Sequence, residues 1–186
     1  MKRSEINARI REALAFCREH DFHLPRWAIW SPQEWAKVGH EADEVRERQL
    51  GWDVTDFGTG DYAGCGLLLF TIRNGQHAEK QNPYAKDYCE KLLLIDEKQL
   101  TPTHFHWAKM EDIICRAGGN LVLELWMADP ESEQRLEEQE VTVSIDGIER
   151  TFAPGERVVL APGESITLPP YMYHNFYAEP GGGMVL

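Results

Sequence analysis

The sequence of 186 residues lacks several features that would point to particular classes of protein. Its longest apolar run, near residues 66–70, is far shorter than the roughly 20 residues that a membrane-spanning helix requires. The charged N-terminus has no apolar stretch behind it, so the sequence shows no readable signal peptide. We therefore expect a cytoplasmic protein that does not bind a membrane.

Cysteine and positive charge are also scarce. The four cysteines form no C-x-x-C pair, which argues against a zinc knuckle and favours free thiols in a reducing cytoplasm. The chain has 19 lysines and arginines against 31 acidic residues, a net charge of -12. This excess of negative charge argues against nucleic acids and anionic membrane surfaces as partners.

The first fifty residues have a helical pattern, and the length suits a single domain. Ile6, Ile10 and Ala13 recur at helical spacing. Ser31 and Glu34 have the spacing of a capping box, with a proline at the first position of the helix. We expect residues 1–50 to form a helical N-terminal arm that packs on a barrel made by residues 51–186.

From residue 51 onward, short apolar runs alternate with glycine-containing turns such as 74–75 and 146–147. Many short strands at this spacing indicate a β-sandwich or β-barrel. The predicted fold is mainly β, with the helical arm at its N-terminus. Strands are expected at 67–73, 91–95, 121–126, 141–145, 149–152, 157–160 and 165–168.

Histidines and one glutamate form a possible metal site. His104 and His106 would share one face of a strand, because side chains alternate faces. Glu111 can join them only if the chain turns between Trp107 and Met110, and His174 would come from a later strand. Three imidazoles and one carboxylate suit Mn(II), Fe(II), Ni(II), Co(II) or Zn(II) and leave coordination positions open. The alternative is two ordinary strand histidines and a surface acid.

The spacing of these residues resembles the two motifs of the cupin superfamily. Residues 104–118 follow the pattern H-x-H-x4-E-x6-G, and residues 163–174 follow most of the second motif. Lys98 and Tyr171 stand where the motifs have glycine, and Asn175 directly follows the histidine. The resemblance implies a jelly-roll-like cupin barrel with these ligands, and the departures concern local turn geometry.

Longer stretches are similar to the bacterial D-lyxose isomerase family, at residues 50–58, 70–75, 90–93 and 103–113. The resemblance implies an enzyme that converts D-lyxose to D-xylulose and, more slowly, D-mannose to D-fructose. It implies a divalent metal, with Mn(II) preferred, and catalytic roles for Lys91 and Glu111. The expected partners are a small sugar and a second copy of the chain in a homodimer.

The end of the sequence departs from this family. Members carry a glutamate after the last strand of the barrel, and that glutamate is a candidate for the catalytic base. This sequence ends at Leu186, in the middle of an expected strand. Either the protein is natively short at this end or a C-terminal segment is missing from the sequence, and we expect the second.

Other functions fit part of the pattern. The same ligand set occurs in metal-dependent cupin dioxygenases, and a non-catalytic cupin could bind a sugar or a metal. A sugar-phosphate isomerase would need a cluster of basic residues, whereas Arg73, Lys91 and Arg116 are scattered.

Lys109 and Asp112 flank the glutamate and could orient it or be surface charges. The aromatic residues Trp107, Tyr173 and Phe176 could line a sugar site or pack in the core, and His20, His23, His40 and His77 are expected at the surface.

Overall fold

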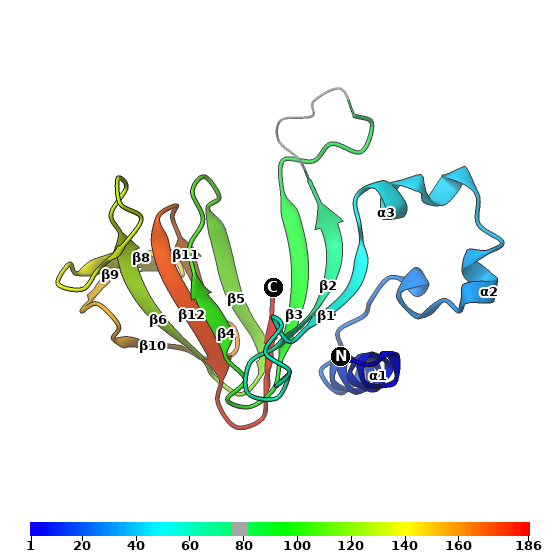
Figure 1. Ribbon diagram of the computed structural model, residues 1–186, viewed down its shortest axis with the longest axis horizontal. Helices are drawn as coiled ribbons and strands as arrows, with labels where there is room; N and C mark the ends of the chain where they lie inside the picture. Colours follow the sequence, from blue (N-terminus) through cyan, green and yellow to red (C-terminus); the bar gives the residue numbers. More distant parts are fainter. Residues whose placement is uncertain (76–81) are drawn as a thin grey trace. The chain divides into compact units, whose positions relative to one another are not determined.

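The structure is a computed structural model that describes residues 1–75 and 82–186. The chain divides into two compact units, Met1–Thr55 with Leu68–Leu93, and Asp56–Leu67 with Leu94–Leu186. The first contains the helices and the second contains most of the strands, so the mainly β fold with a helical N-terminal region is confirmed (Figure 1). No helix among the described residues is both long enough and apolar enough to cross a membrane.

The helical part of the first unit begins with a long amphipathic helix and continues in short turns of helix. The predicted capping box is confirmed: the Ser31 hydroxyl accepts a hydrogen bond from the Glu34 amide, and the Glu34 carboxylate accepts one from the Ser31 amide. The elements are α1 (Arg3–Glu19), η1 (Arg26–Ile29), α2 (Pro32–Trp35), η2 (His40–Ala42) and α3 (Asp43–Glu47).

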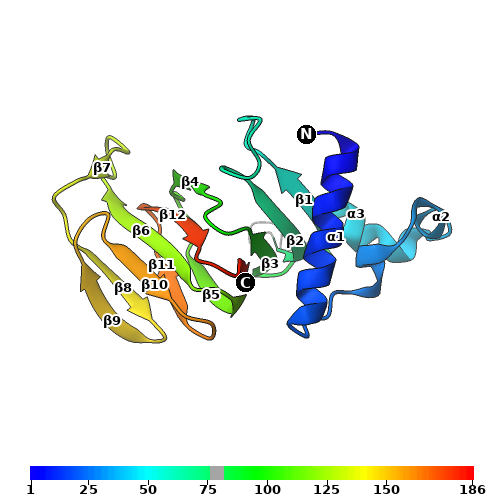
Figure 2. The ribbon, with the colours of Figure 1, turned by 90° about the horizontal axis from the view of Figure 1, so that it is seen from below.

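Aromatic packing joins the helical segment of the first unit to its strands. The strands β1 (Gly51–Thr55), β2 (Leu67–Asn74) and β3 (Cys89–Ile95) are neighbours in that order, and α1 lies beside β1 (Figure 2). Trp27 stacks on Phe70 of β2 at 5.0 Å between ring centroids, and Trp52 meets the same ring edge-on at 4.8 Å. Phe70 is fully buried, so these rings form the core of the unit.

The second unit is built from two groups of antiparallel strands. One runs in the order β13-β5-β11-β8-β9, and the other runs β10-β6-β12-β4, with β7 paired to β6. The strands are β4 (Thr101–His104), β5 (Glu111–Gly118), β6 (Leu121–Ala128), β7 (Arg135–Leu136), β8 (Val141–Ile145), β9 (Ile148–Phe152), β10 (Arg157–Leu160), β11 (Ser165–Leu168), β12 (Met172–Ala178) and β13 (Gly183–Val185).

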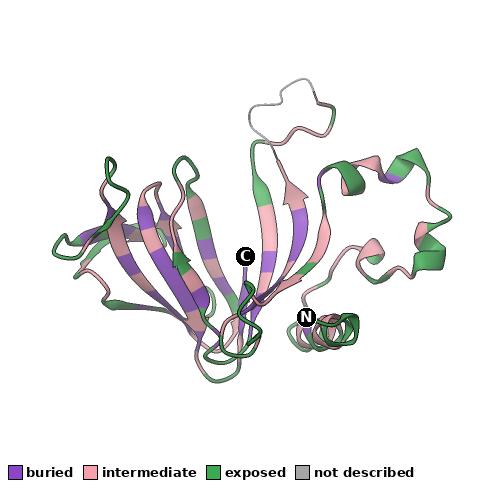
Figure 3. Cartoon of the chain, in the orientation of Figure 1, coloured by how far each residue is buried: buried purple, intermediate pink, exposed green. Residues whose placement is uncertain are grey.

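The alternation of buried and exposed residues along the strands shows where the core of this unit lies. Val141, Val143 and Ile145 of β8 are buried, while the residues between them are more exposed. Buried and more exposed positions also alternate along the strands at the front of Figure 3. Strand β12 lies between β4 and β6, and His174 in its middle is opposite His104 of β4. The histidine from the far end of the sequence is therefore brought beside the H-x-H pair by strand pairing.

The chain changes sheets between the second histidine and the glutamate. Strand β4 ends at His104, and β5 begins at Glu111 in the other group of strands. The turn expected between Trp107 and Met110 is confirmed by the bend in this connector. The expectation that both histidines lie on one strand is wrong, because His106 is already in the connector where the chain leaves the sheet.

The two positions where the cupin motifs have glycine adopt a backbone conformation that favours glycine. Lys98 and Tyr171 both have a φ of 59°. A side chain in this left-handed region costs about 1 kcal/mol or more, because its Cβ crowds the backbone. The chain therefore has left-handed turns at both positions, formed by residues that strain them.

Candidate metal centre

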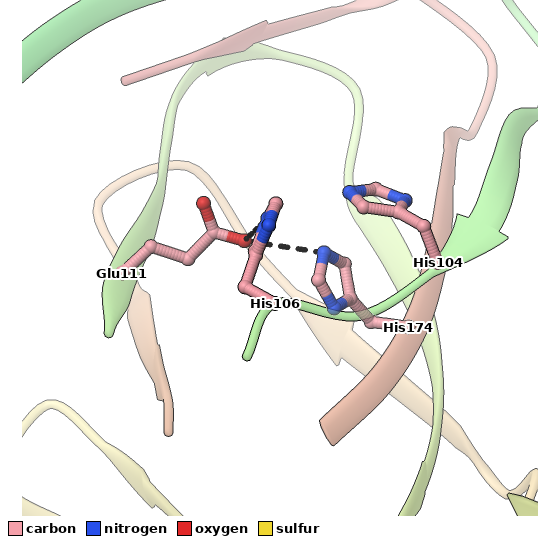
Figure 4. Close-up of side chains that lie close together, drawn as sticks. All are labelled: His104, His106, Glu111 and His174. Carbon is pink, nitrogen blue, oxygen red and sulfur yellow. Dashed lines mark ion pairs between the residues drawn. The ribbon is translucent and has the colours of Figure 1, made fainter. Parts of the chain in front are cut away.

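Four side chains from separate segments meet inside the second unit. His104 comes from the end of β4, His106 from the connector, Glu111 from the start of β5 and His174 from β12. One potential ligand atom from each lies within 4.8 Å of the others. The side chains point toward one another (Figure 4). The spacing pattern therefore predicted the members of a real cluster.

Backbone carbonyls fix which nitrogen two of the histidines present to the cluster. Nδ1 of His104 is 2.8 Å from the carbonyl oxygen of Pro102, and Nδ1 of His174 is 3.0 Å from that of Met172. A carbonyl only accepts hydrogen bonds, so each Nδ1 carries the proton. Each Nε2 is then a lone-pair donor directed at the cluster, which is the form that a metal binds.

The third histidine is held through its backbone. The carbonyl oxygen of His106 accepts a hydrogen bond from the amide of Tyr171, with 2.9 Å between the nitrogen and the oxygen. The Tyr171 ring stacks on Phe105 with 5.8 Å between centroids. These contacts tie the connector to the residue that precedes β12, so the left-handed turn at Tyr171 helps to position His106.

The carboxylate of Glu111 completes the cluster. Its Oε1 lies 3.3 Å from Nε2 of His106 and 3.1 Å from Nε2 of His174. The second oxygen, Oε2, contacts the ammonium group of Lys109. The buried Nε2 of His174 has no hydrogen-bond partner, although it faces the carboxylate at ion-pair distance.

The electrostatics of the cluster favour the neutral forms of His104 and His106 and the ionised form of Glu111. Burial lowers the pKa of His104 and of His106, and the neighbouring histidines lower both further. Burial by itself would raise the pKa of Glu111, but the contacts with His174 and Lys109 outweigh it and hold that pKa below its usual range. The cluster therefore consists of lone-pair donors around one negative charge.

This donor set fits a divalent cation. Lone pairs on neutral imidazoles and on a carboxylate oxygen repel one another at these distances unless a cation lies between them. A His3Glu set is borderline in softness and suits first-row divalent metals, with positions left for other ligands. The unpartnered Nε2 of His174, which is 1% exposed, is the kind of buried atom that such an ion would satisfy.

Other residues singled out from the sequence lie elsewhere. Lys91 is half-buried on β3 in the part of that strand that belongs to the first unit, and its expected catalytic role stays a prediction. Asp112 is exposed and accepts a hydrogen bond from Thr167 at 2.6 Å. Phe176 belongs to the buried core. His20, His23 and His40 are exposed as expected, and His77 lies outside the described residues.

Three hydrogen bonds near the cluster have no signal in the sequence. Glu133, on the loop before β7, accepts hydrogen bonds from the Trp107 indole and, through its carbonyl, from the Tyr173 hydroxyl, each at 2.8 Å. The backbone amide of Tyr171, which holds His106, donates the third. Every residue except proline has an amide, so no residue pattern marks such a donor.

The arrangement of strands occurs in solved sugar isomerases. L-ribose isomerase of Acinetobacter sp. DL28, solved with L-ribose, has a TM-score of 0.62 and 16% sequence identity, and the match covers 100% of this chain and 79% of that one. The L-ribose isomerase of Cellulomonas parahominis, solved with L-psicose, has a TM-score of 0.61 and 14% identity over 100% and 82%. At these identities the likeness shows the shared fold.

Sequence comparison gives the family. The D-lyxose/D-mannose isomerase of Escherichia coli O157:H7 is 48% identical over 187 residues, which covers all of this chain and 81% of that protein. The protein of the same name from Serratia proteamaculans is 49% identical and is covered to 80%. The family model described as D-lyxose isomerase matches residues 1–186. The chain, with its His3Glu cluster, therefore belongs to the D-lyxose isomerase family.

Proposed function

We propose that the protein is a metal-dependent aldose–ketose isomerase that converts D-lyxose to D-xylulose and, more slowly, D-mannose to D-fructose. The observation that carries the proposal is the cluster of three imidazole Nε2 atoms around one carboxylate oxygen, in a chain of this family. Two relatives at 48% and 49% identity bear the name D-lyxose/D-mannose isomerase, which supports the choice of sugars.

The proposed ligands are His104, His106, Glu111 and His174, and the proposed metal is Mn(II), with Zn(II), Co(II), Ni(II) or Fe(II) as alternatives. Bound there, the ion would supply a Lewis acid and a template for the oxygens on C1 and C2 of the sugar. The fixed Nδ1 hydrogen bonds of two of the histidines keep their Nε2 atoms available to it.

The reaction moves a carbonyl group between C1 and C2, either by a hydride shift or through an enediol, and on the enediol route one carbon-bound proton is taken up and returned. Accepting this proton is the proposed second role of Glu111, whose carboxylate is ionised; the contacts that lower its pKa also make it a weak base. Lys91 is proposed to bind or polarise a substrate oxygen. The Lys91→Met variant should then lose most of the activity, roughly 100-fold or more, while it keeps its metal.

An anaerobic assay tests the activity. Metal-reconstituted protein is incubated under argon with a panel of pentoses and hexoses, and the ketose products are measured by chromatography. Conversion of D-lyxose without oxygen supports the isomerase and removes any need for the oxygen chemistry of a dioxygenase. The assay is run with and without the C-terminal segment that the family carries, and no ketose from any sugar in either form, with Mn(II) bound at one ion per chain, would refute it.

The family resemblance also leads us to propose a cytoplasmic homodimer. Equilibrium sedimentation with and without Mn(II) tests the assembly. A mass of twice 21.4 kDa supports the dimer, and a mass of 21.4 kDa at micromolar concentration contradicts it.

A further inference from the structure

The two oxygens of the Glu111 carboxylate have different partners. Oε1 faces Nε2 of His106 and of His174, whereas Oε2 contacts the ammonium group of Lys109. Lys109 lies two residues earlier, on the connector between β4 and β5. The lysine is close enough in the sequence for its side chain to reach the carboxylate, and the two groups are in contact.

We propose that Lys109 is a positioning residue that reserves Oε2 of Glu111, so that the glutamate offers the metal one oxygen only. The proposal rests on the proposed function, because it concerns the ion that the cluster would hold. A carboxylate without such a partner can turn and bind an ion through both oxygens. A charge-assisted contact to an ammonium group competes with that second bond.

The surroundings of Lys109 support this assignment. The Glu111 side chain is 18% exposed, so its oxygens have little access to water as an alternative partner. The Lys109 side chain is 48% exposed, and water therefore solvates much of it while its end group contacts Oε2. Among the described residues, no other lysine or arginine forms an ion pair with Glu111.

Reserving one oxygen has a consequence for the substrate. A six-coordinate ion held by three histidines and one carboxylate oxygen has two positions free, which is the number that the neighbouring oxygens on C1 and C2 require. If both carboxylate oxygens bound, one position would remain. Lys109 would thus keep the site open for both oxygens of the sugar.

The number of water molecules on bound Mn(II) gives a direct test. Water-proton relaxation is measured per bound Mn(II), at saturation established by electron paramagnetic resonance, for wild type, Lys109→Met and Lys109→Arg. The control Lys37→Met removes the same charge at an exposed position of the first unit. Lys109→Met should lower the relaxivity to roughly half, since one of two waters is displaced.

Lys109→Arg should restore the relaxivity, because a guanidinium group can also bind Oε2, and Lys37→Met should match wild type. Relaxivity of Lys109→Met equal to wild type would overturn the proposal. So would a complete loss of Mn(II) from that variant, or a fall that Lys109→Arg does not reverse. If the wild-type protein itself binds no Mn(II) or other divalent metal, the proposed metal-dependent function is refuted. That result differs from the ones above, which refute only the role of Lys109.

Discussion

At the scale of single residues, two hydrogen bonds decide what the cluster can bind. The Nδ1–H groups of His104 and His174 donate to carbonyls two residues earlier in their own strands. This local pattern fixes the ring orientation without help from any other side chain. If these histidines were free to rotate, either ring nitrogen could face the cluster. Holding each ring in one orientation when a metal binds would then cost conformational entropy.

His174 should be indispensable for metal binding. The His174→Ala variant removes the buried Nε2 that has no hydrogen-bond partner, and we expect bound Mn(II) to fall below one tenth of the wild-type content. Elemental analysis of the dialysed protein measures it. His40→Ala is the control, because His40 is exposed and pairs with Asp43 instead. Full occupancy in the His174→Ala protein would show that the ligand assignment is wrong.

The metal-free protein should lose stability as the pH falls. The pKa values of His104 and His106 are lowered in the folded state, so below the ordinary pKa of about 6.5 the unfolded state binds more protons. The lowered pKa of Glu111 adds a loss of the same sign below about 4.5. The free energy of unfolding, from urea titrations in a chelator, should therefore be largest near neutral pH and decrease toward pH 4.

A double variant isolates the contribution of the histidines. His104→Gln with His106→Gln should show a shallower decrease between pH 6.5 and pH 5, because the two groups no longer titrate. An unchanged slope would mean that other groups cause the acid sensitivity.

The identities of the four cluster residues were predictable from spacing, because strand alternation and one turn are strong geometric constraints. The partners of Nδ1, the amide of Tyr171 and the role of Lys109 depend on positions of backbone and side chain that no pattern encodes. The position of His106 was wrong by two residues for the same reason: strand ends depend on pairing partners.

At the scale of elements, the turns that lead into the strands of His104 and His174 carry strain. Lys98 precedes β4 and has a φ of 59° where the cupin motif has glycine. Its amide donates to the carbonyl of Ala178 at 2.9 Å, so the turn is held by a backbone contact that glycine would keep. The cupin motif marks this position as one where glycine is expected. Only the structure shows that the lysine adopts a left-handed conformation there.

Replacing Lys98 by glycine should stabilise the protein. Relief of the left-handed strain exceeds the added entropy of the unfolded chain, and we expect a gain of about 0.5–1 kcal/mol in the free energy of unfolding. Urea titration measures it. Lys98→Ala removes the same side chain but keeps a Cβ, so it should give no gain. If both variants gain the same free energy of unfolding, the effect comes from loss of the lysine side chain and not from relief of backbone strain.

At the scale of the whole molecule, the cluster links segments that are distant in the sequence. Residues 104, 111 and 174 belong to three different strands of the second unit. A ligand that binds the folded state alone stabilises it in proportion to the logarithm of its concentration. Metal binding is therefore expected to stabilise the fold of this unit as well as to create the reactive site.

Removing the metal should lower the melting temperature. Mn(II) at 100 times its dissociation constant would add about 2.7 kcal/mol to the free energy of unfolding. Differential scanning calorimetry with Mn(II) and then with excess EDTA measures the change. The His174→Ala variant should melt at one temperature in both conditions. If EDTA leaves the melting temperature of the wild-type protein unchanged, the ion does not stabilise the fold.

The fixed tautomers have a practical consequence for anyone who prepares the protein. A cluster whose lone pairs already face inward can accept any divalent ion of suitable size, and intrinsic affinities for such donors favour copper, nickel and zinc over manganese. The metal in a purified sample would then record the trace elements of the growth medium. Activity per milligram would vary between preparations until the protein is stripped and reloaded with one chosen ion.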